Sequence, residues 1–192
     1  MDSNETHIEV HRPWRAGETI FLVGPGGVGK SSLGRELSRL LGWPLIDLDL
    51  EFCGRIGIIG PYIAKHGYDR YRQENLMLAE GLADASRGPA VFVTASGFLA
   101  GSPQSDDKVR ARRLVGSGYG ITLLPSLNVE LATSIVVERQ LARGFGLERM
   151  SEERKFRERF SIYRYLGDML VVSTDQPARV AAEVVDKLVT SI

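Results

Sequence analysis

Short apolar runs alternate with amphipathic stretches along most of the chain. After residues 1–18, which show no sustained period, runs rich in Val, Ile and Leu predict strands, and stretches whose apolar residues recur every three or four positions predict helices. The predicted strands cover 19–23, 45–48, 91–94, 121–124 and 169–173, and the predicted helices cover about 30–41, 73–85, 107–115, 129–143, 151–165 and 177–189. Strands that alternate with helices form a parallel sheet with helices on both faces, so the pattern predicts an α/β fold.

The predicted helix at 30–41 shows how the elements are delimited. Its apolar stripe is made of Leu33, Leu37, Leu40 and Leu41. Gly42 ends the helix, since glycine readily takes the left-handed conformation that closes one, and Pro44 prevents a restart. No repeat, low-complexity tract or linker follows, so we expect one domain over 19–192, preceded by a flexible arm at 1–18.

Composition and charge exclude several classes of protein. Of 192 residues, 43% are hydrophobic and 25% are charged, as in soluble globular proteins. Because 24 basic residues balance 24 acidic ones, no net charge favours nucleic acid or a membrane surface. No apolar run is long enough to span a bilayer, and the single cysteine, Cys53, excludes an intramolecular disulfide. We expect a cytoplasmic protein, a monomer or weak homodimer, with a small molecule as its partner and no nucleic acid or membrane.

A glycine-rich loop follows the first predicted strand. The segment Gly24-Pro25-Gly26-Gly27-Val28-Gly29-Lys30-Ser31 fits the phosphate-binding pattern G-x-x-x-x-G-K-[ST] at every fixed position. Glycines let several backbone N–H groups surround a phosphate, and the next helix directs its positive end at the same anion. The lysine neutralises the β- and γ-phosphates, and the serine hydroxyl can ligate Mg²⁺. A chance glycine-rich turn is the alternative, which the strand before the loop and the helix after it disfavour. The predicted nucleotide site comprises Gly24, Gly26, Gly27, Val28, Gly29, Lys30, Ser31 and Ser32.

The loop alone does not name a reaction, because GTPases, ATPase motors and small-molecule kinases all carry it. The chain has no Asn-Lys-x-Asp base-reading motif and is short for a motor. Asp47 and Asp49 end the second predicted strand, where residues two apart project the same way toward the phosphates. One carboxylate can hold Mg²⁺ through water, and the other can accept a proton from an attacking hydroxyl. The alternative is a solvated loop that happens to carry two acids.

From about residue 19 to the C-terminus, the chain resembles the shikimate kinase family. The resemblance implies that Asp47 supports Mg²⁺. It implies that Asp49 binds the acceptor hydroxyl and can act as the base that takes its proton. The family motif G-E-x-x-F-R is similar to residues 67–72, which implies that Arg72 binds the substrate carboxylate. Two planar arginines suit bidentate recognition of a carboxylate, and the second one follows later in the chain.

Two further motifs extend the resemblance. The lid motif R-P-L-L is similar to residues 139–142, so Arg139 corresponds to the arginine that reaches the transferring phosphoryl group. The motif R-x-P-L-Y is similar to residues 159–163, so Arg159 corresponds to the second carboxylate-binding arginine. The family implies a three-layer α/β/α P-loop kinase fold with a five-stranded parallel sheet, a substrate-binding segment at about 50–80 and a mobile lid at about 138–150.

The chain departs from the family pattern around the acceptor. Ala95-Ser96-Gly97 replaces three glycines, and Ser96 and Gly97 are still expected to contact the substrate. Two new side chains at a place of close approach are expected to narrow or reshape the pocket. Asn75 stands where the family has a glutamate that orients the first arginine, and Gln140 replaces the lid proline. Ser134 stands near where the family has an adenine-stacking arginine, and the nucleotide and metal set Gly29, Lys30, Ser31 and Asp47 is unchanged.

We therefore expect an enzyme that uses ATP and Mg²⁺ to phosphorylate a hydroxyl of shikimate or a closely similar carboxylated cyclic polyol, a reaction that belongs to aromatic amino acid biosynthesis when the acceptor is shikimate. Lys30, Asp49 and Arg139 are the expected catalytic residues, and Ser31 and Asp47 the expected metal ligands. A kinase of the same fold for another polyol or cyclitol is one alternative. A catalytically silent module that binds a small ligand is the other.

Overall fold

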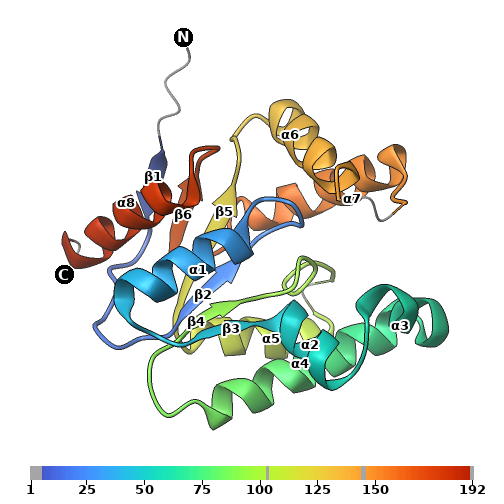
Figure 1. Ribbon diagram of the computed structural model, residues 1–192, viewed down its shortest axis with the longest axis horizontal. Helices are drawn as coiled ribbons and strands as arrows, with labels where there is room; N and C mark the ends of the chain where they lie inside the picture. The colour runs from blue at the N-terminus through green and yellow to red at the C-terminus, as the bar shows by residue number, and fades with distance from the viewer. Residues whose placement is uncertain (1–5, 103, 144–145, 191–192) are drawn as a thin grey trace.

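The computed structural model describes residues 6–102, 104–143 and 146–190. Its strands form one sheet in the order β1-β6-β5-β2-β4-β3 (Figure 1). The strands are β1 (His7–Val10), β2 (Ile20–Val23), β3 (Leu45–Asp47), β4 (Val91–Val93), β5 (Tyr119–Leu124) and β6 (Met169–Val172). All neighbouring pairs are parallel except β1 with β6.

Helices cover both faces of this sheet. They are α1 (Lys30–Leu41), α2 (Leu48–Arg55), α3 (Ile59–His66), α4 (Tyr68–Ala85), α5 (Asp106–Gly116), α6 (Val129–Leu141), α7 (Arg149–Tyr163) and α8 (Pro177–Thr190). Helices α1 and α8 pack on one face, and α4 and α5 pack on the other. The pair α6 and α7 and the group α2 and α3 lie on either side of the loop before α1 (Figure 1). The predicted three-layer α/β/α fold is confirmed.

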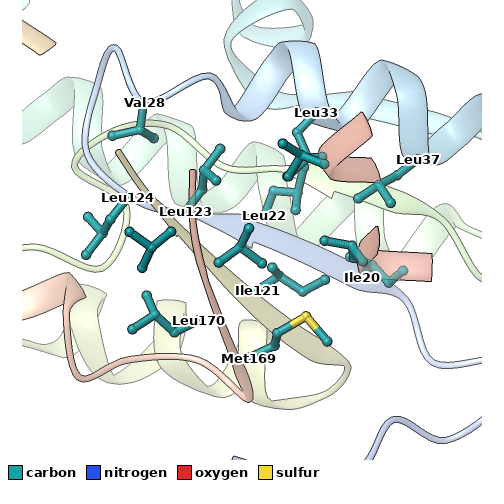
Figure 2. Packing of buried hydrophobic residues seen from close by; sticks show 14 of the residues in the cluster. Ile20, Leu22, Val28, Leu33, Leu37, Ile121, Leu123, Leu124, Met169 and Leu170 are labelled. Carbon is teal, nitrogen blue, oxygen red and sulfur yellow. The ribbon is translucent and has the colours of Figure 1, made fainter. Parts of the chain in front are cut away.

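The central strand β2 shows how the sequence pattern produces these layers. Successive strand side chains point to opposite faces of a sheet. Ile20 and Leu22 accordingly pack with the leucines of α1 and the apolar side of α8 (Figure 2), whereas Phe21 and Val23 pack with α4 and α5. All four β2 side chains are buried, which is typical of a parallel strand covered on both faces.

The N-terminal segment corrects two predictions. Residues 7–10 are not a flexible arm but pair antiparallel with β6, so the sheet has six strands instead of five. The segment is anchored by Arg12, whose guanidinium donates to Asp168 at 2.9 Å and to Glu18 at 3.0 Å. The strand was missed because it is short, lies at a sheet edge and leaves its side chains partly exposed, so it carries little apolar alternation.

The second miss lies between β3 and α4. Helices α2 and α3 occupy a stretch for which the sequence showed no helical period, because Gly54, Gly57, Gly60 and Pro61 interrupt it. Helix α4 also begins five residues before the predicted start, at Tyr68 instead of position 73.

The order of the strands determines where a ligand binds. From β2 the chain passes to one side of the sheet for β3 and β4, and then to the other side for β5 and β6. In open α/β sheets, ligands bind at such a reversal, beyond the carboxyl ends of the strands. The loops that follow β2, β3, β4 and β5 all start from this edge.

Close packing of α1 against the sheet yields a stability prediction. A Cβ on Gly34 would lie 2.5 Å from Val93 Cγ2 and 3.3 Å from Leu22 Cδ1. Gly34→Ala should therefore lower the free energy of unfolding by about 1–3 kcal/mol. Gly81→Ala in α4, where nothing lies within 4 Å of the new Cβ, should raise it by about 0.5–1 kcal/mol. Urea denaturation measures both, and equal stability of the two variants would contradict the packing.

Candidate active site

The phosphate loop connects β2 to α1 and depends on glycine for its shape. Gly27 has φ +80°, and a Cβ there would lie 2.9 Å from Val136 Cγ1 of α6. Gly29, with φ +102°, precedes α1 and offers no side chain to cap it, and the first turn of α1 has no acidic residue. The N–H groups that begin α1 are thus available to an anion.

Lys30 lies inside this loop. Only 8% of its surface is exposed, and its Nζ donates to the carbonyl oxygens of Gly24 and Pro25, both at 2.8 Å. Burial lowers the pKa of Lys30 to about 8, and the charges of Asp49 and Asp47 act in the opposite direction. The ammonium is thereby held by neutral carbonyl groups, with two carboxylates close enough to influence its charge.

A cavity of about 460 Å³ adjoins the loop, a volume in the range of small-molecule sites. It is lined by residues 27–29, 32 and 33 of the loop and α1, by Arg139 and Arg143, and by residues 173–177 between β6 and α8. Arg139 was predicted to act here, and it is exposed in the last turn of α6. The 173–177 segment was not predicted, because a polar turn before a helix carries no distinctive motif.

Arg143 is a second arginine that the sequence analysis missed. It follows the end of α6, and its charge lowers the pKa of both Lys30 and Asp49, after the larger effects of burial and of neighbouring carboxylate and lysine charges. The family motif is similar to the sequence at Arg139, four residues earlier, and no motif marks Arg143. Of the predicted lid at 138–150, positions 144–145 lie outside the described residues.

Asp47 and Asp49 lie at the carboxyl end of β3, as predicted, but not both in a strand. Asp47 ends β3 and caps α2, where its Oδ1 accepts a hydrogen bond of 3.2 Å from the Asp49 N–H. Asp49 belongs to the first turn of α2. Its surface is exposed, yet desolvation by the surrounding protein raises its pKa, against the charges of Lys30 and Arg143. A helical turn, not strand alternation, therefore brings the second carboxylate toward Lys30.

Arg159 of α7 meets the turn that follows β4. Its Nη1 donates to Ser96 Oγ at 3.0 Å, and its Nη2 donates to the Tyr68 hydroxyl at 3.2 Å. A Cβ on Gly97 would collide with that hydroxyl and lie 3.2 Å from Arg159 Nη2, so a larger residue at this position would displace the Tyr68 side chain. Ala95 is buried in the core beneath the turn. Three of the predicted acceptor residues are thus brought together, and Tyr68 joins them without having been predicted.

Arg72 of α4 is engaged by a carboxylate from another helix. Its Nε donates to Asp107 Oδ2 at 3.0 Å, and its Nη2 donates to the same oxygen. The adjacent Lys108 is 3% exposed and donates to the carbonyl oxygens of residues 97 and 98 at 2.9 and 3.0 Å. A crevice of about 20 Å³ among these residues has room for little more than a water molecule. The sequence placed Asp107 and Lys108 at a helix start but gave no sign that they contact Arg72 and the turn after β4.

The described residues contain neither a ready-made metal cluster nor a membrane-spanning helix. Within the described ranges, no three His, Cys, Asp or Glu side chains gather closely enough to hold a metal ion by themselves. None of the helices in the described part of the chain is both long and apolar enough to cross a membrane.

Comparison with known proteins now decides the family. A family model described as shikimate kinase matches residues 26–189. The chain belongs to the shikimate kinase family. The shikimate kinase of Halorhodospira halophila is 33% identical over 178 residues, which cover 91% of this chain and 96% of that protein. The shikimate kinase of Enterococcus faecalis is 29% identical over 175 residues, which cover 89% and 98%.

Solved structures share the fold of this family member. A shikimate kinase from Acinetobacter baumannii, in complex with shikimate, aligns with a TM-score of 0.72 and 24% identity, over 91% of this chain and 94% of that one. A gluconokinase from Sinorhizobium meliloti aligns with a TM-score of 0.62 and 20% identity, over 93% and 94%. At these identities the likeness shows the fold alone.

The depressed pKa of Lys30 predicts a pH-dependent stability. The ordinary pKa is 10.5 and the folded pKa is about 8, so between these pH values the unfolded chain binds more protons and stability rises with pH. Lys30→Met removes this contribution. The unfolding free energy of the wild type minus that of Lys30→Met should therefore rise by about 1.4 kcal/mol per pH unit from pH 8 to 10. Denaturation at several pH values measures it, and parallel profiles would contradict the burial of a charged lysine.

Proposed function

We propose that this shikimate kinase family member transfers the γ-phosphoryl group of ATP to a hydroxyl of shikimate or a closely similar carboxylated cyclic polyol. One observation carries the proposal: the Lys30 ammonium, enclosed by the phosphate loop, lies at the same edge of the sheet as Asp49 in the first turn of α2 and Arg159 beside the turn after β4. The charges of Lys30 and Asp49 also influence each other's pKa. Phosphoryl transfer requires charge neutralisation and alignment more than covalent chemistry, and these groups supply both.

The nucleotide is expected in the cavity beside the phosphate loop. The loop glycines with Val28, Lys30, Ser31 and Ser32 would surround the phosphates, while the remaining cavity between α6 and the 173–177 segment would take the nucleoside. Lys30 would exchange its two loop carbonyls for phosphate oxygens. Arg139 and Arg143 enter the same cavity, so both are positioned to neutralise charge that develops on the transferring group.

Mg²⁺ fits the oxygen groups at this edge. Asp47 Oδ1 accepts the Asp49 N–H, and no described residue donates a hydrogen bond to Oδ2, which is left for a cation or its water. The Ser31 hydroxyl lies in the first turn of α1, beside the loop. Mg²⁺ is usually held by one or two such groups together with phosphate oxygens and water, and when bound it neutralises phosphate charge.

The acceptor hydroxyl is assigned to Asp49. A carboxylate with a raised pKa is a better proton acceptor than one at its ordinary value, provided that it remains ionised near neutral pH. Asp49 would orient the hydroxyl toward the γ-phosphate and take its proton as the new P–O bond forms. Lys30, on the other side, would stabilise the phosphoryl oxygens.

The acceptor carboxylate is assigned to Arg72 and Arg159, within the substrate-binding segment at about 50–80 and beside the lid at about 138–150. Among the described residues, the hydrogen bonds of the Arg159 guanidinium go to the neutral hydroxyls of Ser96 and Tyr68, which a carboxylate would replace with a stronger, charge-assisted partner. Because Tyr68 contacts Arg159 and its own side chain is 41% exposed, it can withdraw into solvent as the acceptor enters. Gly97 would then bring its backbone close to the ring.

The alternatives differ in what they need from these residues. A kinase for another polyol would keep Lys30 and Asp49 and use Ser96 to select the acceptor. A silent binding module would not need the electrostatic coupling between Lys30 and Asp49. The presence of this coupling therefore favours an enzyme over a silent module.

A coupled assay of ADP release tests the function with shikimate, its methyl ester and gluconate as acceptors. Turnover should be fastest with shikimate, and the methyl ester should lower kcat/KM at least about tenfold, because the ester cannot pair with the arginines. Equal rates with acid and ester would remove the carboxylate from the proposal. No turnover with any acceptor, together with tight ligand binding, would favour the silent module.

Asp49→Asn separates catalysis from binding. If Asp49 accepts the proton, the substitution should lower kcat at least about a hundredfold while leaving nucleotide affinity nearly unchanged. Glu51→Gln is the matched control, since Glu51 lies in the same helical turn and pairs with Arg55 at 2.6 Å. Steady-state kinetics of both variants measure the effect. A kcat for Asp49→Asn close to that of the control would remove Asp49 as the base.

A further inference from the structure

The first turn of α5 places two side chains beside the acceptor arginines. The Asp107 side chain is 17% exposed and the Lys108 side chain 3%, whereas their neighbour Asp106 is 87% exposed. Charged residues at a helix start are usually solvated, and burial of two adjacent ones needs compensating partners. Both have such partners, and these include Arg72 and the turn that carries Ser96 and Gly97.

Asp107 determines how Arg72 is oriented. It accepts the Nε–H and one Nη2–H of Arg72, which are the donors along the side of the guanidinium. At the end of the guanidinium, with Nη1 and the second Nη2–H, the one hydrogen bond to a described residue goes from Nη1 to Asp69, at 3.4 Å, and the Asp69 side chain is 90% exposed. A guanidinium has five N–H donors, so the end remains able to bind a carboxylate in bidentate fashion.

Arg72 has no comparable support from its own helix. Asn75 lies one turn further along α4 and is 3% exposed, but it carries no charge, and its Nδ2 has no hydrogen-bond partner among the described residues. Asp69 is solvated. Within the described part of the chain, Asp107 is therefore the only shielded carboxylate that contacts Arg72.

Lys108 supports the other arginine indirectly. Its ammonium binds the carbonyls of Gly97 and Phe98, in a turn closed by the Phe98 N–H bonded to the Ala95 carbonyl at 3.0 Å. The same turn carries Ser96, whose hydroxyl accepts from Arg159. A rigid turn holds that hydroxyl, and with it Arg159, in one place.

We propose that Asp107 and Lys108 are positioning residues for the acceptor: Asp107 holds Arg72 with its end directed at the acceptor carboxylate, and Lys108 holds the turn that supports Arg159. The inference rests on the proposed function in one respect, that the acceptor carries a carboxylate. Neither residue touches the phosphoryl group or the nucleotide cavity, so their effect is confined to acceptor binding.

Both residues are charged near neutral pH, as this role requires. Burial acts to raise the pKa of Asp107, but hydrogen bonds from Arg72 and Ser105 outweigh it and bring the pKa below its ordinary value. Burial lowers the pKa of Lys108 to about 8, so the ammonium form predominates at pH 7.

Steady-state kinetics with shikimate and ATP test the proposal. Asp107→Asn should raise the KM for shikimate at least about tenfold, with kcat and the KM for ATP changed less than about threefold. Asp106→Asn is the matched control, one residue away in the same turn, and should change none of the three. Asp107→Glu retains the charge and should restore part of the lost affinity. Lys108→Met should raise the KM for shikimate, and Lys108→Arg should recover part of it.

Three results would overturn the assignment. A lower KM for shikimate in Asp107→Asn would show that Asp107 competes with the acceptor for Arg72. An unchanged KM would show that the contact has no role in binding. A lower kcat together with a lower melting temperature in Asp107→Asn, neither of which recovers in Asp107→Glu, would show a purely structural role.

A measurement without turnover separates this proposal from the proposed function. Nuclear magnetic resonance of arginine Nε–H groups in the full chain, with the Arg72 signal identified by its loss in Arg72→Lys, reports the bond to Asp107 directly. The signal should shift or broaden in Asp107→Asn and remain in Asp106→Asn. If no acceptor is phosphorylated but this signal behaves as expected, the proposed reaction fails and the orientation of Arg72 stands. An unaffected signal would overturn the orientation itself.

Discussion

The burial of positive charge at the carboxyl edge of the sheet is the constraint on which the site depends. Lys30 and Lys108 are nearly enclosed, and each ammonium is bonded to two backbone carbonyls of a turn that follows a central strand. A buried ammonium without such acceptors would be strongly destabilising, so the conformations of the two turns and the positions of the two lysines are mutually dependent. Arg72 is neutralised by Asp107, whereas the hydrogen-bond partners of Arg159 in the described part of the chain are neutral, so Arg159 has more to gain from an anionic ligand.

These charges meet because of the strand order rather than because of local sequence. The phosphate loop follows β2, Asp47 and Asp49 follow β3, the turn with Ser96 follows β4, and the lid residues follow β5 through α6. A parallel sheet places all of these carboxyl ends along one edge, and the reversal of chain direction at β2 keeps the edge open. The fold thus supplies the proximity, while the individual side chains supply the sign and strength of the field.

The sequence predicted those parts of the molecule whose signal is local. The continuous apolar run of β2, the leucine stripe of α1 and the glycines of the phosphate loop can all be read within a few residues, and each was found. Strand β1 and helices α2 and α3 were missed, since an edge strand has little alternation and glycines interrupt the helical period. Four residues near the site were not predicted for a different reason: Asp107, Lys108, Tyr68 and Arg143. They reach the site through contacts between segments far apart in the sequence, and no spacing along the chain encodes such contacts.

The segment Ala95-Ser96-Gly97 stands after β4 where the family has three glycines, and each of its positions has a different physical consequence. The sequence predicted that the side chains of Ala95 and Ser96 would narrow or reshape the acceptor pocket. Instead, the methyl group of Ala95 joins the core cluster on the α4 and α5 side, where it displaces no ligand. Gly97 is retained where any Cβ would meet the Tyr68 hydroxyl. Only Ser96 changes the chemistry of the site, since its hydroxyl accepts from Arg159 and orients that guanidinium before an acceptor arrives. A pocket that looks altered at two positions is therefore altered at one, and the change acts on Arg159, the arginine proposed to bind the carboxylate, not on Lys30 or Asp49.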